Sequence, residues 1–407
     1  MRRQKTIMLL GAGPDQTIAI RIARSLGYRV LAVDGNPYAR GLKEAHIGLS
    51  GDIQDAQAMI QIGKKYKVHG VMAHAVEMPV VVAHIAKSLG LPGLDPKVAG
   101  RATNKLQRIE RLKAQGVPCP KFETAHTIKQ ARERAQSIGF PCVCKPIDNS
   151  ASRGVSLVSN VREVAHAYQE ALSFSHQKVV LIEEYLQGHD LSSEAVVWEG
   201  KVYHTAFSDR NYGDTKRYLP RFVEDGGDMP TKLSFKELAR VKLAIEQAIE
   251  ALQIRFGAAK GDIIIVRDGP KILEMACRTS GGFFCSAQTP LQNGIQILKP
   301  LIQMSVGDRV NEEDLLPKHS KPSIERYVFT RPGKIRSIKG IRRAATMPGI
   351  KFVQLLSNFK RDPILPPTPT DIHKVAVVIG TGKSQSQARR YVQQAVAQIK
   401  VQMEQHE

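Results

Sequence analysis

The stretch that decides the fold is residues 261–282, which read GDIIIVRDGPKILEMACRTSGG. Two runs rich in β-branched residues flank Asp268-Gly269-Pro270, and this arrangement predicts a β-hairpin. If those three residues form the loop, position 262 lies opposite 276 and position 264 lies opposite 274. Because side chains alternate across a strand, the hairpin is expected to carry one polar row on one of its faces.

The polar row consists of Asp262, Glu274 and Arg278. Carboxylates on neighbouring strands can hold a hard divalent cation, which prefers oxygen ligands. An arginine on the same row can clamp a phosphoryl group or a carboxylate. Taken alone, the hairpin fits two interpretations equally: a site for a cation and an anion, or a charged face in contact with solvent.

Composition indicates a globular chain. Its 407 residues are enough for two or three domains, with 42% hydrophobic and 24% charged residues. No run of eighteen apolar residues is present, so no transmembrane helix is expected. The first apolar run, 6–10, ends at Gly11, which favours a buried strand over a signal peptide.

Five cysteines without a CxxC pair predict reduced thiols and a cytoplasmic location. They are Cys119, Cys142, Cys144, Cys277 and Cys285.

The charge balance is strongly basic. Fifty-nine Lys and Arg against thirty-eight Asp and Glu give a net charge of +21, which attracts polyanions. The basic residues are spread along the chain, and the sequence contains no zinc finger and no RNA-recognition signature. We therefore expect an enzyme with anionic ligands, and neither specific nucleic-acid binding nor membrane binding.

Residues 5–95 alternate strand and helix patterns, which predicts a parallel sheet with helices on its faces. The turn at 11–16, GAGPDQ, joins the first strand to the first helix, and Asp34 ends the next strand. A dinucleotide site would look similar. However, Gln16 stands in place of the third glycine, and Pro14 removes a backbone donor that a pyrophosphate needs. A tight turn that is open to a substrate is therefore favoured over nicotinamide binding.

A basic helix is expected over 98–115, with Asn104 and Lys105 inside it. Residues 120–187 predict a compact α/β unit. In this unit Lys145 ends an apolar strand and precedes the small-residue loop 147–154, which can cradle phosphates through backbone N–H groups and hydroxyls. The alternatives are a solvated lysine at 105 and an ordinary hairpin loop.

Residues 188–232 predict antiparallel strands and then a polar loop, 210–230, whose length and composition suit a lid or a substrate-side loop. Ser234 and Glu237 predict the capped start of a long helix. The C-terminal segment is expected to contain two strands and a final helix, at 324–330, 374–379 and 384–403.

The ordered set of motifs resembles the ATP-grasp superfamily of ADP-forming ligases. Within it, the chain is similar to the carboxylate–amine ligase branch, which contains the L-amino acid ligases and shares its core with biotin carboxylase and carbamoyl phosphate synthase. The motifs are Asn104-Lys105; Lys145-Pro146 before a loop ending Arg153-Gly154-Val155; Glu183-Glu184-Tyr185-Leu186-x-Gly188-x-Asp190; Gly257-x4-Asp262; and Leu273-Glu274-x3-Arg278-x2-Gly281-Gly282.

The resemblance covers nearly the whole chain and implies an α/β fold, α+β in its C-terminal body. An N-terminal Rossmann-like pre-ATP-grasp domain would precede a two-lobed ATP-grasp fold. The implied parts are a pre-ATP-grasp domain at 1–95, a linking helix at 96–117, a lid subdomain at 118–187, a catalytic body at 188–310 and a C-terminal part of the body at 311–407.

The resemblance also implies an ATP site. Lys105 and Lys145 would contact phosphates, and the loop 150–154 would close over them. Backbone groups of 184–186 would contact adenine, and Asp190, where the family more often has Glu, would face the ribose. The implied nucleotide-binding residues are Lys105, Lys145, Ser150, Ser152, Gly154, Glu184, Tyr185, Leu186 and Asp190.

For the chemistry, the resemblance implies that Asp262 and Glu274 hold Mg²⁺, with Mn²⁺ as an alternative metal. Arg278 and Lys145 are the implied catalytic residues; Arg278 would stabilise the transferred phosphoryl group, the acyl-phosphate or the acceptor carboxylate. The sequence departs from the family pattern in two places. Asp262 follows Lys260 where many relatives have Glu and His, and Ala276 stands where an Asn commonly assists the metal. Either one or two working metal sites are compatible with these changes.

The implied function is an ATP-dependent, ADP-forming ligase. It would activate a carboxylate, that of an amino acid, as an acyl-phosphate and transfer it to an amine. Phosphoryl transfer to a carboxylate gathers several anions, which requires cations and metal, and a lid protects the acyl-phosphate from water. The expected partners are ATP and small carboxylate and amine substrates, and a homodimer is compatible with the family. The alternative is an ATP-binding regulatory protein with altered catalysis.

Several segments are candidates for selecting the substrate. Lys216, Arg217 and Arg221 could grip an anionic substrate, although a solvated basic loop is slightly favoured. A structural role is favoured over a catalytic base for His74. The candidates are the turn 11–16, His74, Glu77, the loop 210–224 and residues 278–284.

Overall fold

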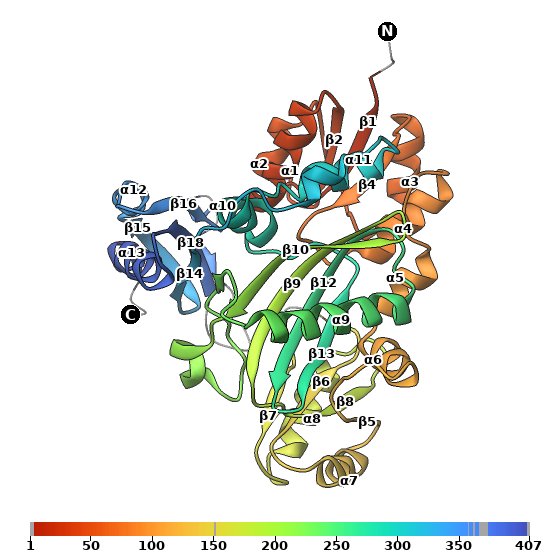
Figure 1. Cartoon of the computed structure of the whole chain (residues 1–407), viewed down its shortest axis with the longest axis vertical. Coiled ribbons are helices and arrows are strands. Elements are labelled where there is room, and N and C mark those ends of the chain that lie inside the picture. Colours follow the sequence, from red (N-terminus) through yellow and green to blue (C-terminus); the bar gives the residue numbers. More distant parts are fainter. Residues whose placement is uncertain (1–3, 150–151, 357, 361–362, 366–372, 405–407) are drawn as a thin grey trace.

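The strands within the described residues form four sheets. The computed structural model describes residues 4–149, 152–356, 358–360, 363–365 and 373–404. Figure 1 shows the N-terminal elements at one end of the long axis, the lid strands at the other end, and the C-terminal elements to one side. No helix among the described residues is long and apolar enough to cross a membrane.

The N-terminal sheet has the order β3-β2-β1-β4, and every pair in it is parallel. This confirms the parallel sheet that the alternation predicted. Strand β3 and helix α3 were not predicted, because alternate residues of β3 are exposed and it lacks an apolar run. The bounds are β1 (Thr6–Leu10), α1 (Pro14–Ser25), β2 (Arg29–Asp34), α2 (Arg40–Glu44), β3 (Ile47–Ser50), α3 (Ala56–Lys65), β4 (Gly70–Ala73) and α4 (Pro79–Ser88).

The turn after β1 is braced from inside the protein. The Ala12 N–H donates to Asp34 Oδ2 at 2.6 Å, and the Asn36 N–H donates to Asp34 Oδ1 at 2.8 Å. Gln16 Nε2 donates to the His74 carbonyl at 2.9 Å. The residues that would complete a dinucleotide fingerprint are therefore used to hold the turn in place.

Two helices, and not the single predicted helix over 98–115, link this sheet to the lid. They are α5 (Pro96–Thr103) and α6 (Lys105–Ala114). Asn104 is extended between them, and its side chain accepts from the Gln107 N–H at 3.0 Å, which caps α6. Helical propensity alone did not reveal this break. It places Lys105 at the start of α6, where its N–H donates to the Ile147 carbonyl at 2.8 Å.

The lid sheet is antiparallel and has the order β5-β8-β6-β7, with α7 and α8 packed against it. The predicted cap of α7 is present, because Thr127 Oγ1 accepts from the Gln130 N–H at 3.2 Å, and the helix ends at Gly139 with φ +96°. The bounds are β5 (Phe122–Ala125), α7 (Ile128–Ile138), β6 (Cys142–Pro146), β7 (Ser156–Val158), α8 (Val164–Ser173) and β8 (Val180–Glu184).

An eight-stranded sheet forms the body, in the order β13-β12-β9-β10-β11-β14-β18-β16. Helix α9 packs along β13 and β12, as Figure 1 shows. Its predicted capping box of Ser234 and Glu237 is present. The bounds are β9 (His189–Trp198), β10 (Lys201–Arg210), η1 (Gly213–Tyr218), β11 (Gly227–Met229), α9 (Phe235–Leu252), β12 (Gly257–Val266), β13 (Gly269–Ala276), β14 (Ser323–Thr330), β16 (Ile350–Leu355) and β18 (His373–Thr381).

The hairpin of β12 and β13 exists, but its predicted register is wrong by two residues. Asp262 lies opposite Glu274, and Lys260 lies opposite Ala276. Val266 pairs with Gly269, so the loop has two residues and not three, and the register shifts after Asp262. The irregularity leaves Asp262 and Glu274 as direct cross-strand neighbours, which brings the two carboxylates closer than the predicted register would.

The last part of the chain extends the eight-stranded sheet and adds a three-stranded one. The predicted final helix over 384–403 is wrong in its second part: α13 ends at Gln398, and the β-branched residues after it form an edge strand, β19. Helix α11 contacts α1, β4 and β12, so it joins the N-terminal sheet to the body. The bounds are η2 (Phe284–Gln288), α10 (Thr289–Asn293), α11 (Leu298–Ser305), η3 (Glu312–Leu315), β15 (Gly333–Lys339), α12 (Ile341–Ala345), β17 (Ile364–Leu365), α13 (Gln385–Gln398) and β19 (Lys400–Met403).

Candidate active site

Glu274 is the carboxylate of the hairpin that is surrounded by cations. Burial alone would raise its pKa, but the charges of Lys260, Arg108 and Lys105 hold the pKa well below its usual range. Within the described part of the chain, the structure records no hydrogen bond to this side chain. Glu274 is therefore an ionised carboxylate with coordination positions to offer a cation.

Asp262 is already engaged. It forms an ion pair with Lys260 Nζ, Arg210 Nη2 donates to its Oδ1 at 2.7 Å, and Ser192 Oγ donates to the same oxygen at 3.3 Å. The cations lower its pKa although burial opposes them. A metal at this position must take the place of at least one of these cations.

The donor set fits Mg²⁺ with part of the shell supplied by the substrate. The described residues contain no group of three His, Cys, Asp or Glu side chains that could hold a metal. Two cross-strand carboxylates remain, Asp262 and Glu274. Mg²⁺ is commonly bound by one or two carboxylates together with phosphate oxygens and water, so this pair is sufficient once a nucleotide is present.

Arg278 connects the hairpin to the N-terminal sheet. Its Nε donates to Glu77 Oε2 at 2.5 Å, and its Nη1 donates to the Thr279 carbonyl at 3.1 Å. Glu77 follows β4, two hundred residues earlier in the chain, so sequence spacing could not reveal the pair. One edge of the guanidinium is thus fixed by Glu77 and the group is oriented next to the two carboxylates.

The two lysines expected at the phosphates lie on either side of the lid–body junction. Lys145 Nζ forms a buried ion pair with Glu183 Oε2 at 2.5 Å. Lys105 Nζ donates to the Asn149 carbonyl. Both contribute to the same field, since the charge of Lys145 acts on the pKa of Lys105. The structure therefore brings Lys105, Lys145 and Glu274 into one electrostatic cluster.

The small-residue loop 147–154, which is expected to cradle phosphates, is described only in part, because Ser150 lies outside the described residues. Ser152 and Gly154 both have positive φ, +56° and +70°. A Cβ at Gly154 would lie 2.9 Å from the Phe174 ring, so this glycine is required by close packing as well as by its backbone. Arg153 Nε donates to Asn149 Oδ1 at 3.0 Å, which ties the loop to the contact made by Lys105.

Residues 184–186, the expected adenine contact, start at the end of β8 and are held to two neighbouring segments through Glu184. The Glu184 N–H donates to the Lys121 carbonyl at 2.9 Å, and its side chain accepts from Lys271 Nζ at 3.1 Å. Glu184 thus joins Lys121, the residue before β5, to Lys271 of β13, and its N–H is engaged within the protein. Asp190 lies opposite Ile264 on β12, and burial raises its pKa.

The loop 210–230 binds the lid. Arg221 Nη2 pairs with Glu170 Oε1 of α8 at 2.5 Å, and the Leu157 N–H of β7 donates to the Pro220 carbonyl at 2.9 Å. Arg221 is therefore engaged by the lid, and Lys216 is exposed. The side chain of Arg217 lies outside the described residues.

A cleft of about 440 Å³ opens beside the hairpin, between the N-terminal turn, the body and the C-terminal strands. Its charged side chains are Lys260, Arg278 and Arg210 at one end and Glu224, Lys374 and Glu325 toward the other. Glu224 Oε2 lies 3.8 Å from both Arg210 Nη1 and Lys374 Nζ, so it stands between the two ends. Phe283, Phe284 and Leu356 supply apolar wall. The cleft thus offers a cationic end next to Glu274 and an end with carboxylates further away.

Asp15 and His74 shape the wall of this cleft. His74 Nε2 lies 3.0 Å from Asp15 Oδ1, and His74 Nδ1 lies 2.8 Å from Thr279 Oγ1. Asp15 also accepts from the Phe283 N–H at 3.1 Å. Both buried side chains have all their partners inside the protein, which assigns them to positioning residues 279–283 against the turn after β1.

Sequence reasoning missed the contribution of the C-terminal strands. Glu325, Tyr327 and Lys374 line the cleft but lie far from every recognised motif. A signal was present: β14 reads SIERYVFT, and its Glu and Arg are buried at 4% and 6% exposure in an otherwise apolar strand. Buried charged residues are rare, so such a pair indicates a site or an ion-pair network.

The proton balance of ATP binding should depend on Lys105. Burial, its largest influence, lowers the pKa of Lys105 to about 8. Between pH 7 and 9 the empty protein therefore loses this charge, and bound phosphates would restore it. We expect ATP binding to take up close to one proton above pH 8 and much less at pH 7, measured by calorimetry in two buffers of different ionisation enthalpy. Lys105→Met should abolish the uptake; uptake that persists in this variant would refute the assignment.

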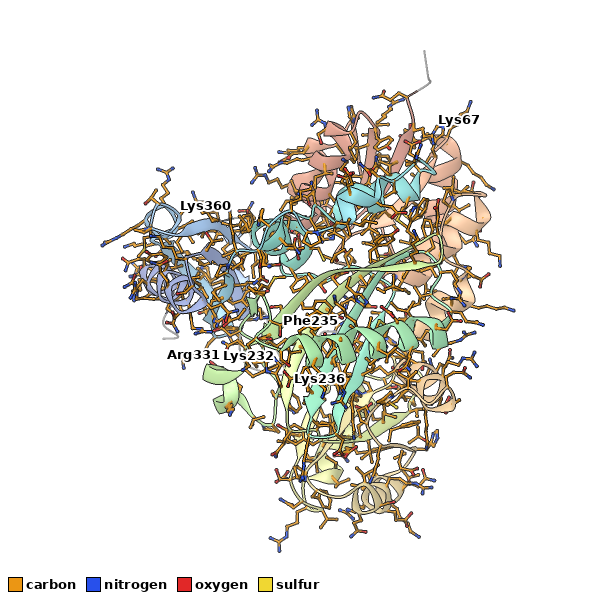
Figure 2. All side chains as sticks on the ribbon, viewed as in Figure 1. Lys67, Lys232, Phe235, Lys236, Arg331 and Lys360 are labelled. Carbon is orange, nitrogen blue, oxygen red and sulfur yellow. The ribbon has the colours of Figure 1, made fainter. Side chains whose placement is uncertain are left out.

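The charged side chains are distributed over several faces of the molecule. Figure 2 labels exposed Lys67 near the N-terminal sheet, Lys360 near the C-terminal elements, and Lys232, Lys236 and Arg331 elsewhere. The labelled basic residues therefore lie in different parts of the fold.

Comparison with known families gives two matches within the chain. Residues 102–282 match the family described as ATP-grasp domain, and residues 326–404 match the one described as L-amino acid ligase C-terminal domain 2. Among curated proteins, the formate-dependent phosphoribosylglycinamide formyltransferase of Synechocystis sp. is 30% identical over 189 residues. This alignment covers 45% of the present chain and 48% of the relative, so the match spans about half the length of that protein.

Solved structures share the fold over the full chain. The L-amino acid ligase from Bacillus licheniformis superposes with a TM-score of 0.82 at 16% identity, covering 100% of both chains. The biotin carboxylase domain of the 2-oxoglutarate carboxylase from Hydrogenobacter thermophilus, a complex with MgADP, ADP and bicarbonate, has a TM-score of 0.77 at 18% identity and covers 99% of this chain and 91% of that one. The chain therefore carries an ATP-grasp domain at residues 102–282 and a segment similar to the L-amino acid ligase C-terminal domain 2 at residues 326–404, within a fold that these solved structures share.

Proposed function

We propose that this protein is an ATP-dependent, ADP-forming ligase that activates the carboxylate of an amino acid as an acyl-phosphate and joins it to an amine. The observation that carries the proposal is one arrangement of charges. Ionised Glu274 and fixed Arg278 lie in one electrostatic cluster with Lys105, and Lys260 and Arg278 also line the 440 Å³ cleft. A nucleotide phosphate and a substrate carboxylate could therefore meet beside the hairpin.

The reaction follows from the roles of these side chains. Lys105 and Lys145 would bind phosphate oxygens, and Arg278 would hold the transferred phosphoryl group. Mg²⁺ held by Glu274 and Asp262 would neutralise charge on the phosphates. A substrate carboxylate oxygen attacks the terminal phosphorus and ADP leaves; the amine then attacks the acyl carbon, phosphate leaves with its four oxygens, and the amine loses a proton. No protein nucleophile is needed, and burial raises the pKa of the nearby Cys277 thiol to about 12.

The cleft also suggests how an amino acid would be oriented. Its carboxylate would face Arg278 and Lys260, and its ammonium group would face Glu325 at the other end. Glu325 is 4% exposed, and its Oε2 has no hydrogen-bond partner within the described part of the chain. Burial raises the pKa of this carboxyl to about 8 in the empty cleft. An ammonium group would supply the missing partner and favour the ionised form.

Glu325→Gln should therefore discriminate against substrates that carry an ammonium group. We expect KM for the amino acid to rise about tenfold or more and KM for ATP to change less than about twofold, since a charge-assisted contact is replaced by a neutral one. Steady-state kinetics on both substrates provide the measurement. Glu133→Gln, an exposed substitution on α7 of the lid, is the matched control and should leave both constants unchanged. Equal effects of the two substitutions would exclude Glu325 as the ammonium contact.

The proposal is tested by measuring ADP release with ATP, Mg²⁺ and pooled amino acids, other carboxylic acids and amines. The expected result is ADP release that requires one acid and one amine. A second candidate function, an ATP-binding regulatory protein, is favoured by one observation: Lys260 and Arg210 already neutralise Asp262. Tight ATP binding without ADP release from any pool would support this second candidate and exclude the first.

A further inference from the structure

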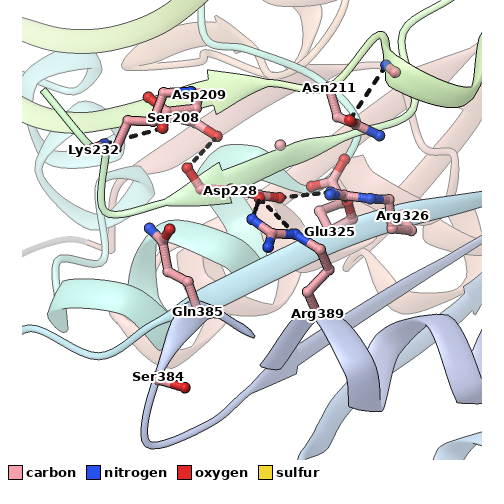
Figure 3. A network of polar contacts seen from close by, with 12 residues as sticks. Ser208, Asp209, Asn211, Asp228, Lys232, Glu325, Arg326, Ser384, Gln385 and Arg389 are labelled. Carbon is pink, nitrogen blue, oxygen red and sulfur yellow. Dashed lines mark hydrogen bonds and ion pairs between the residues drawn. The ribbon is translucent and has the colours of Figure 1, made fainter. Parts of the chain in front are cut away.

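A second cleft, of about 360 Å³, lies at the seam between the body and the C-terminal elements. It opens between β10 and β11 on one side and β14 and α13 on the other, and Figure 3 shows the polar network around it. The lining residues are His189, Asp209, Arg210, Asn211, Asp228, Lys232, Arg326, Gln385, Arg389 and Gln393. None of these residues apart from Arg210 lines the first cleft.

Both carboxylates of this second cleft are occupied by partners within the protein. Asp228 Oδ1 pairs with Arg326 Nη1 at 2.7 Å, and Asp228 Oδ2 pairs with Arg389 Nη2 at 2.5 Å. Asp209 accepts from the Lys232 N–H at 3.0 Å and contacts His189 Nε2 at 2.7 Å. Neither carboxylate is therefore available to neutralise a further cation.

The cations exceed the anions. Arg210 is already paired with Asp262, so Lys232, Arg326 and Arg389 oppose Asp209 and Asp228, which leaves one positive charge before any protonation of His189. Within the described part of the chain, the structure records no hydrogen bond or ion pair to Lys232 Nζ or to Arg389 Nη1. The neutral amides of Asn211, Gln385 and Gln393 add donors that do not alter the charge. The second cleft thus presents spare donors and an excess of positive charge in a concave space.

We propose that the second cleft binds a small anion, either a phosphate-bearing compound or a di- or tricarboxylate. Arginine guanidinium groups match the oxygen spacing of both kinds of anion, and Lys232 adds an ammonium group that has no recorded contact among the described residues. The volume of about 360 Å³ is at the lower end for small-molecule sites, which suits a compact anion better than a whole nucleotide.

The second cleft is coupled to the hairpin through Arg210. This side chain lines both clefts, donates to Asp262 Oδ1 at 2.7 Å and lies 3.8 Å from Glu224. Its Nε is buried without a partner among the described residues. An anion in the second cleft attracts the Arg210 guanidinium and weakens its pairing with Asp262, the expected metal ligand. The anion is therefore also expected to change the Mg²⁺ requirement of any ATP-dependent reaction at the hairpin.

Calorimetric titration with pyrophosphate and with citrate tests the proposal. ADP is kept saturating and Mg²⁺ is left out, so that the nucleotide site is filled and neither anion is chelated; the salt is kept at about 0.15 M to screen diffuse attraction. We expect millimolar or tighter binding of at least one anion. Lys232→Gln and Arg389→Gln should each weaken it about tenfold. Lys232→Gln breaks no recorded side-chain contact, so it keeps the test valid if Arg389→Gln unfolds the protein.

Arg390→Gln provides the matched control, because Arg390 neighbours Arg389 on α13 but is exposed and lies outside the second cleft. It should change anion binding less than about twofold, as expected for a screened surface charge. Binding of pyrophosphate alone assigns a phosphate-bearing ligand, and binding of citrate alone assigns a carboxylate. The proposal is overturned if neither anion binds below 10 mM, an upper limit of about 3 kcal/mol of binding free energy, if Lys232→Gln leaves binding unchanged, or if Arg390→Gln weakens binding equally.

Discussion

Replacement of Glu274 by glutamine is expected to lower the turnover number about 100-fold or more while changing ATP affinity less than about tenfold. The reason is that four cations hold the pKa of Glu274 low and so keep its carboxylate ionised. Among the described residues, the structure records no hydrogen bond to this carboxylate. Glutamine keeps the shape of the side chain but removes the charge that would hold the metal. Nucleotide contacts from the lid and the hinge remain, so binding and turnover should separate. The measurement is ADP release at saturating ATP, alongside calorimetric ATP titration.

Glu250→Gln serves as the control for this prediction. Glu250 is an exposed residue at the end of α9 that pairs with Arg255, remote from the cleft, and its loss should leave turnover unchanged. Thermal melts of both variants must remain cooperative, because Glu274→Gln leaves Lys260 and Arg108 with less compensating charge. Unchanged turnover in a folded Glu274→Gln variant would exclude Glu274 as the metal ligand.

Replacement of Arg278 by lysine is the second large effect, with kcat expected to fall about 10²–10³-fold. Lysine keeps the positive charge but cannot bind Glu77 and a phosphoryl oxygen at the same time through a planar fork. The Arg278 Nε contact to Glu77 at 2.5 Å fixes the guanidinium, and the remaining donors are then oriented toward the cleft. Steady-state kinetics with ATP and the acid varied separately would measure the effect.

The distribution of this loss between kcat and KM identifies what Arg278 binds. A loss in kcat with little change in KM indicates an interaction that is made in the transition state, as expected for the transferred phosphoryl group. A loss confined to KM for the acid would instead indicate that Arg278 only binds the substrate carboxylate. Arg255→Lys, an exposed substitution, should have no effect on either constant.

The elements of the hairpin could be predicted from sequence, but their register could not. The alternation of apolar and charged residues in 261–278 is local, and it correctly indicated two strands with the acids on one face. The register depends on a two-residue loop and an irregularity after Asp262, which are settled by pairing with β9 as well as β13. The pairing of β12 with β9 and β13 therefore sets the register, and the expected three-residue loop did not predict it.

The helix predictions failed where one residue can end one element and start another. Asn104 interrupts the expected helix over 98–115 because its side chain caps α6 more favourably than it continues α5. At the other end of the chain, Ile399 is the extended residue that ends α13, and pairing with β15 places Val401 in β19. In both cases the local sequence pattern is compatible with more than one structure, and the neighbouring element determines which one forms.

The partners of the site residues could not be predicted at all. Arg278 with Glu77, Arg210 with Asp262, and Glu325 at the wall of the first cleft join segments that are 50 to 200 residues apart. The resemblance to the ATP-grasp superfamily indicated which positions are expected to take part in the reaction. It carried no information on Lys260 beyond its departure from the pattern, and the structure gives that departure a physical meaning, because the ammonium group of Lys260 pairs with Asp262.

The most direct test of the proposed reaction follows oxygen from the substrate carboxylate. The acid identified by the ADP-release measurement is labelled with oxygen-18 in its carboxylate and turned over with ATP, Mg²⁺ and the amine. Activation as an acyl-phosphate transfers one carboxylate oxygen to phosphate, so each released phosphate should carry one labelled oxygen and the nucleotide product should be ADP. Unlabelled phosphate, or AMP as the nucleotide product, would contradict the account.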